Sequence, residues 1–222
     1  MKLIKELFHY RFEIYFVSLL CILFGSLLFP VKLYESVMLP IFFLLNLISG
    51  TLVFYKRKRI VRLFSFIFFF VLLKDILSKV LGKTDKFFEI GAFGMFFIFY
   101  CVISVVIIEE LWRTKKVNKN LIIGLMSGYL SIGLVGFFMF SAIELTHPNS
   151  FNGLLIQEEL EGKLDTLMYF SYITLMTIGY GEITPLTALA QKAAILMGVL
   201  GNFYTVILTA VVLEKYIRAG NK

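Results

Sequence analysis

Long apolar segments recur along this chain at lengths that fit a lipid bilayer. A helix that crosses the hydrocarbon core needs about 20 predominantly apolar residues, because every backbone polar group there must be bonded within the helix. Of the 222 residues, 59% are hydrophobic and 25 are Phe, which is more apolar surface than a soluble domain needs. The sequence therefore predicts an all-α integral membrane protein. Six transmembrane helices are expected, at 14–29, 37–55, 60–81, 87–111, 121–145 and 188–216.

Two of these segments leave alternatives open. Residues 1–11 are basic and amphipathic and fit a helix at the membrane surface, but a charged start before an apolar run also fits a signal peptide. We favour a retained helix, because no clear small-x-small cleavage site precedes Pro30. In the third segment, Lys74 and Asp75 point to different faces of a helix. Either the helix leaves the hydrocarbon near Lys74, or one of the two charges turns inward to a partner.

The basic residues are unevenly divided between alternate loops. Of the 22 Lys and Arg residues, 15 lie at the two termini and in the 56–62 and 113–119 linkers, and seven lie on the other side. Because cytoplasmic loops are enriched in Lys and Arg, both termini are predicted to be cytoplasmic and the 146–163 loop external. The linkers also suit anionic lipid head groups, although topology alone explains them. A net charge of +7 distributed in this way predicts no nucleic-acid partner.

A short glycine-containing motif, Thr177-Ile178-Gly179-Tyr180-Gly181, stands out among the apolar segments. A strand whose successive backbone carbonyls face one axis replaces the water around a dehydrated K⁺ ion. Such a strand needs alternating backbone handedness, which glycine adopts without a steric penalty. Gly179 and Gly181 stand where this is required, and the Thr177 hydroxyl adds a further ring of oxygens.

The surroundings of the motif favour this interpretation over a Gly-Tyr-Gly turn in an unrelated membrane protein. Residues 165–176 are apolar and aromatic, with Asp165 as the expected N-cap, and form a helix of about half a bilayer. The negative end of its dipole points toward a cation in the membrane interior. Pro185 ends the exit loop, and a helix of full spanning length begins near Ala188. One such loop cannot encircle an ion, so four copies around a fourfold axis are expected.

Residues from about Leu121 to Tyr216 resemble the pore of tetrameric potassium channels in the ion-channel superfamily, especially its small bacterial six-helix members. The resemblance rests on the 177–181 motif, on Thr184-Pro185 and on the glycines of the last helix. It implies a homotetramer in the bacterial inner membrane, with K⁺ held by Thr177, Ile178, Gly179 and Tyr180. It also implies a voltage-sensor-like four-helix bundle at 1–118 and a pore domain at 119–222. Within the pore domain it implies an outer helix at 121–145, a pore helix at 165–176, a filter at 177–181 and an inner helix at 188–216.

The resemblance also implies roles for residues around the filter. Tyr180 would turn its ring outward against Tyr169 and Phe170, and Glu144 resembles an outer-helix glutamate that braces the filter. Gly201 falls where these channels often carry a hinge glycine. The chain departs from the family in three places: Glu182 replaces the usual aspartate, Met176 replaces a common threonine, and Ile173 replaces the carboxylate of some members.

The last helix carries a stripe of small and hydroxylated residues. Gly198, Gly201, Thr205 and Thr209 share one face, with Asn202 beside them. Because the helix must line something polar below the filter, we expect this stripe to line a cavity, with close helix packing as the alternative. Glu214 forms either a ring at the cytoplasmic mouth or a pair with Arg218.

The fourth segment lacks the charges of a voltage sensor. Moving a charge across the field supplies about 2.3 kcal/mol per 100 mV, so sensors carry repeated Arg or Lys. Residues 87–111 contain neither, and their only charges are Glu89, Glu109 and Glu110. Weak or no voltage dependence is therefore expected.

A passive potassium channel is the function that these features favour. A potassium transporter or its conducting subunit usually carries four pore loops in one chain and reduces GYG to a single glycine. A non-conducting modulatory membrane protein would leave the filter unexplained. The sequence shows no nucleophile–base pair or metal cluster, and Cys21 and Cys101 lie in apolar segments. We therefore expect neither an enzyme nor a cofactor, with K⁺ as the permeant ligand.

Overall fold

The computed structural model describes residues 10–30, 33–54, 57, 59–67, 69–70, 86–114, 119–154 and 160–220. Its α-helices are α2 (Arg11–Phe24), α4 (Leu39–Val53), α6 (Lys86–Arg113), α7 (Lys119–Thr146), α8 (Leu160–Leu175) and α9 (Ala188–Gly220). A 3-10 turn follows α2 at Gly25–Leu27, and a π-helical turn precedes α4 at Tyr34–Met38. Two-residue strands β1 (Phe151–Asn152) and β2 (Thr184–Pro185) complete the fold.

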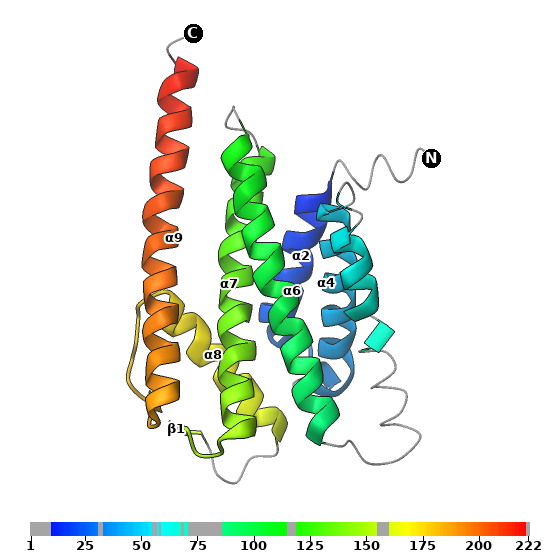
Figure 1. Ribbon diagram of the computed structural model, residues 1–222, viewed down its shortest axis with the longest axis vertical. Helices are drawn as coiled ribbons and strands as arrows, with labels where there is room; N and C mark the ends of the chain where they lie inside the picture. The colour runs from blue at the N-terminus through cyan, green and yellow to red at the C-terminus, as the bar shows by residue number, and fades with distance from the viewer. Residues whose placement is uncertain are drawn as a thin grey trace.

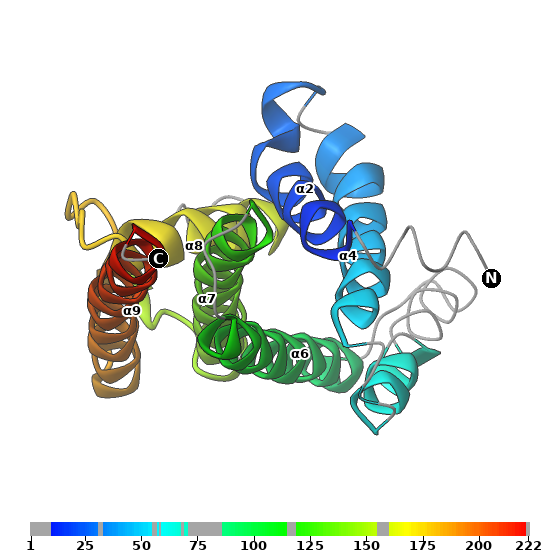
Figure 2. The same cartoon turned by 90° about the horizontal axis from the view of Figure 1, so that it is seen from above.

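Helix α7 lies at the centre of the arrangement. It contacts α2 and α6 on one side and α8 and α9 on the other (Figures 1 and 2). Helix α8 is short and lies beside α7 and α9 in the half of the molecule that holds β1 (Figure 1). Among the described residues, the main contacts between the N-terminal and the C-terminal helices therefore run through α7.

Three of the described helices are long and apolar enough to cross a membrane, within α6, α7 and α9. Helix α4 is a shorter apolar helix. The chain is therefore mostly helical and fits a membrane protein, as the composition predicts. The other predicted segments are shorter: the first ends at Phe24, and the second ends at Val53. The third is helical at 59–67 and 69–70, and Lys74 and Asp75 lie outside the described residues.

The prediction that Asp165 caps the pore helix is wrong. Helix α8 begins at Leu160, so Asp165 lies inside it. Leu164 packs against the core and Leu167 is buried, so the apolar face of the helix continues on both sides of Asp165. A continuous apolar face stabilises helix beyond the position that capping chemistry alone indicates.

Neutral hydrogen bonds join the buried faces of α2, α4, α6 and α7. Tyr100 donates to Asn46 Oδ1 at 2.8 Å, and Asn46 Nδ2 donates to Ser18 Oγ at 2.8 Å. The Tyr15 hydroxyl lies 2.8 Å from Ser131 Oγ on α7. All five side chains are buried. Because lipid offers no alternative partners, such bonds hold membrane helices in one register.

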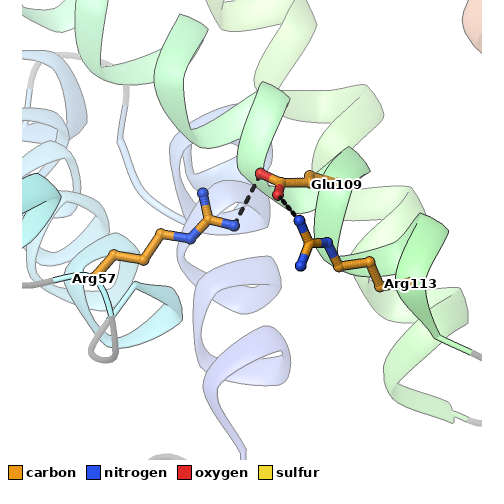
Figure 3. Close-up of polar contacts among 3 residues, drawn as sticks. All are labelled: Arg57, Glu109 and Arg113. Carbon is orange, nitrogen blue, oxygen red and sulfur yellow. Dashed lines mark hydrogen bonds and ion pairs between the residues drawn. The ribbon is translucent and has the colours of Figure 1, made fainter.

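Several ion pairs lie at the end of the molecule where α2 and α7 begin and α6 ends. Arg57 and Arg113 each donate to one oxygen of Glu109, at 2.9 and 2.7 Å (Figure 3). Arg11 pairs with Glu110, and this arginine also lies over the ring of Phe12.

A further pair in the same region joins Lys119 to Glu13, with an N···O distance of 2.8 Å. Arg57, Arg113 and Lys119, three residues of the basic linkers, are thus paired within the chain, which leaves less of that charge free for lipid head groups. Exposed pairs of this kind contribute little to the free energy of unfolding, because water and salt screen them.

Replacing Asn46 tests the buried hydrogen bonds. An Asn46→Leu change keeps the branched shape of the side chain but leaves the Tyr100 and Ser18 hydroxyls without this partner. We expect the free energy of unfolding to fall by about 1–3 kcal/mol, measured by helix content in a detergent-denaturation series. Leu45→Ala, on the exposed face of the same helix, should change it by less than about 0.5 kcal/mol. Equal losses in both variants would contradict a specific role for Asn46.

Candidate functional site

The backbone of residues 177–181 alternates in handedness. Thr177, Gly179 and Gly181 have φ values of 56°, 57° and 93°, whereas Ile178 and Tyr180 have no positive φ. In an L-peptide, this alternation brings successive carbonyl groups toward one side of the strand. Positive φ at the two glycines follows the sequence-based expectation. Positive φ at Thr177 does not, and it costs about 1–2 kcal/mol that the surroundings must offset.

Backbone bonds to the end of α8 hold the start of this strand. The Thr177 amide donates to Thr174 O at 3.0 Å, and the Ile178 amide donates to Ile173 O at 2.9 Å. The Gly179 amide is 3.4 Å from the same carbonyl. Position 173, where some relatives carry a carboxylate, thus supports the strand through its backbone, while its side chain is buried.

The strand is open to one side in a single chain. Tyr180 has 73% of its surface exposed, and Ile178 has 46%. No other atom lies within 4 Å of the position that a Cβ would take at Gly179 or Gly181. This side of residues 177–181 is therefore uncovered in the single chain.

Tyr169 and Phe170 lie on different sides of α8, one exposed and one buried. The neighbouring Glu182 carboxylate raises the pKa of Tyr169 to about 12. The Phe170 ring is buried against Phe140 and Phe151, at centroid distances of 5.0 and 5.5 Å. The expected packing of Tyr180 on both aromatic rings is therefore not met within one chain.

Glu144 binds the loop that follows α7. Its two carboxylate oxygens accept from the amides of Asn149 and Ser150, both at 2.9 Å. Asn149 has a φ of 64°, and the carboxylate stabilises this turn. The loop then forms β1, which pairs antiparallel with β2 just beyond residues 177–181, with Phe151 opposite Pro185. Glu144 thus acts on the exit of the strand through the loop.

Helix α7 supports α8 through backbone carbonyls that sequence reasoning missed. Ser171 donates to Gly133 O at 2.6 Å, and Tyr172 donates to Leu130 O at 2.7 Å. A Cβ at Gly133 would lie 2.2 Å from the Tyr172 ring, so only glycine admits this approach. The small residues of α7 are the signal that indicates such a contact.

The predicted cavity stripe on α9 divides into two parts. Gly201 is buried, and a Cβ there would lie 1.9 Å from Leu175 O at the end of α8. Gly201 therefore serves close packing within the chain, which corrects its placement on the cavity face. Gly198 has open space around it. The other stripe residues are exposed in the single chain: Asn202, Thr205 and Thr209, with Glu214 further along.

These groups suit a cation that sheds its water. The strand offers backbone carbonyls and one hydroxyl, without a charged side chain between residues 177 and 181. Within the described residues, no group of three or more His, Cys, Asp or Glu side chains is placed to hold a metal. The C-terminal end of α8, which carries partial negative charge, stands at the start of the strand.

Residues 159–218 match a protein-family model described as Ion channel. The match covers α8, residues 177–181, β2 and nearly all of α9. It supports an ion channel, and so a non-enzymatic membrane protein whose permeants are ions. No match was found among curated proteins or among solved structures.

Two glycines of α9 give a matched test of this geometry. Gly201→Ala forces the backbone of Leu175 away, whereas Gly198→Ala enters open space. We expect Gly201→Ala to lower the free energy of unfolding by about 1–3 kcal/mol, as overpacking of a tight contact does. Gly198→Ala should stay within about 0.5 kcal/mol of the parent protein. Thermal unfolding in detergent measures both, and equal stability of the two variants would rule out the close contact at Gly201.

Proposed function

We propose that this chain is a potassium-selective channel that conducts K⁺ passively through a filter built from residues 177–181 of four copies. The observation that carries the proposal is the alternating φ along Thr177–Gly181, in a strand anchored on the end of α8. Carbonyl oxygens of Thr177, Ile178, Gly179 and Tyr180, with the Thr177 hydroxyl, replace the hydration shell of K⁺. Under this proposal, the chain is similar to the small bacterial six-helix channels. It lies in the bacterial inner membrane, with both termini in the cytoplasm.

Selectivity follows from the number and spacing of these oxygens. A ring from one residue in four copies presents four carbonyls, and neighbouring rings together replace the lost water. Several sites in a row let one ion displace the next, so binding does not prevent release. The end of α8 adds negative potential at the inner side of the strand.

The exposure of α9 supports assembly into a tetramer. Only 17% of the most apolar stretch of α9 is buried inside the single chain, compared with 67% of the corresponding stretch of α7. Its exposed residues separate into a small and polar stripe, with Asn202, Thr205 and Thr209, and an apolar face. The apolar face includes Val199, Phe203 and Val206, which are 43%, 64% and 61% exposed. In the proposed tetramer, the polar stripe and Gly198 line the cavity, Glu214 lies at its inner mouth, and the apolar face meets neighbouring copies or lipid.

The proposed bundle at 1–118 supports the pore and does not sense voltage. Buried neutral hydrogen bonds at Tyr15, Asn46 and Tyr100 join the bundle to α7 and join its own helices. The two acidic residues near the end of α6, Glu109 and Glu110, are paired with arginines. Helix α6 carries no series of basic residues that a field could move.

Flux from liposomes tests the filter. The purified protein is reconstituted with a K⁺ gradient, and flux is compared in K⁺ and in Na⁺. We expect K⁺ flux to exceed Na⁺ flux by at least about 100-fold, since the carbonyl rings select K⁺. Gly179→Val should abolish K⁺ flux, because a β-branched residue resists the φ of 57° at this position.

Chemical cross-linking gives the control for assembly. The parent protein and Gly179→Val should both cross-link to a tetramer, so that lost flux reflects the filter. Equal Na⁺ and K⁺ flux in the parent, or unchanged flux in Gly179→Val, would contradict the proposal. Selective uptake against the gradient would instead indicate a transporter.

Planar-bilayer recording tests the bundle. Without charge that moves in the field, the open fraction should change by less than about threefold over 100 mV. A steep conductance–voltage relation that persists without blocking ions would contradict this expectation.

A further inference from the structure

Ser150 lies where the loop after α7 meets the segment that follows the filter. It is fully buried and forms four hydrogen bonds. Its amide donates to Glu144 at 2.9 Å, and its carbonyl accepts from the Leu186 amide at 2.8 Å. Its hydroxyl donates to His147 O at 2.6 Å and accepts from the Thr187 hydroxyl at 3.2 Å.

Thr187 continues this connection into α9. Its hydroxyl oxygen accepts from the Ala190 amide at 3.3 Å, as the N-cap of the helix. Its carbonyl accepts from the Gln191 amide at 2.9 Å. Hydrogen bonds therefore run from the end of α7 through Ser150 to the start of α9, directly beside the exit of the filter.

The residues after Ser150 hold the exit segment at a second point. Strand β1 pairs with β2, with Asn152 opposite Thr184. Gly153 then has a φ of 87°, and a Cβ there would lie 2.1 Å from the carbonyl oxygen of Glu182. Glu182 is the residue that directly follows the proposed filter. The exit segment is thus fixed at its start and at its end by one loop.

We propose that Ser150 is a positioning residue for ion coordination, through which Glu144 holds the exit of the filter. This inference rests on the proposed potassium conduction. In the contacts described above, the Glu144 carboxylate accepts only from amides of the loop. Its connection to Leu186 and Thr187 therefore passes through Ser150. The outer carbonyls of the filter lie a few residues before this anchor. Loss of the anchor lets them move apart, which weakens K⁺ coordination and admits Na⁺.

Single hydroxyl deletions in the full-length chain test this role in the liposome flux assay. Ser150→Ala removes the hydroxyl that joins Thr187 and His147. Thr187→Val removes the other partner at constant volume, while Thr187→Ser keeps it. We expect Ser150→Ala and Thr187→Val to raise the K⁺ concentration for half-maximal flux about three- to tenfold, because each variant loses the Ser150–Thr187 bond and one further hydrogen bond. The ratio of K⁺ to Na⁺ flux should fall with it.

Two comparisons separate positioning from general destabilisation. Thr187→Ser should stay near the parent protein, and so should Thr146→Val, whose hydroxyl bonds lie outside the exit segment. The double variant Ser150→Ala with Thr187→Val should change the half-maximal concentration by less than the two single changes combined, because the Ser150–Thr187 bond is lost in both single variants and can be lost only once. Cross-linked tetramer is measured for every variant.

Parent-like values in assembled Ser150→Ala and Thr187→Val would overturn the proposal. So would additive effects in the double variant. If Ser150→Ala fails to assemble, the half-maximal K⁺ concentrations of Thr187→Val and Thr187→Ser decide whether the proposal holds. A parent protein without K⁺-selective flux would overturn the proposed function together with this role, whereas a selective parent with unaffected variants would overturn the role of Ser150 alone.

Discussion

A strand that turns its carbonyls toward ions cannot satisfy its own backbone, so the surrounding protein must hold it. At membrane depth, irregular backbone is tolerated only where it is buried in protein or lines a polar cavity. In residues 177–181, the first amides donate to the carbonyls of Ile173 and Thr174. The segment that follows is held by β1 and Ser150.

Helix α7 transmits this support to the rest of the chain. Its carbonyls at Leu130 and Gly133 accept hydrogen bonds from α8, and the hydroxyl of Ser131, between them in sequence, meets Tyr15 of α2. Both halves of the protein therefore bind one turn of the same helix. Neutral hydrogen bonds of this type fix a register and carry no charge across the membrane, in keeping with a supporting role for the proposed bundle.

Much of the helical layout follows from sequence. The ends of α6 and α7 and the start of α9 fall within one turn of their predicted positions, because spanning helices are set by long apolar runs. The start of α8 lies more than one turn before its predicted position, because Leu164 and Leu167 extend its packed face past the expected cap at Asp165. The β1–β2 pair was also missed, since two-residue strands carry no periodic pattern and form only when the 151–152 and 184–185 segments meet.

By itself, the sequence determined where alternating handedness is possible and where mobile charge is absent. Both are local properties: glycine permits positive φ wherever it stands, and a helix without Lys or Arg has none to move. The tertiary structure alone decided which side chains support the site. Only folding places Gly201 against Leu175 O, Phe170 between Phe140 and Phe151, and Ser150 between Glu144 and Thr187. These contacts join residues from separate elements, and their energies depend on distances that no local pattern encodes.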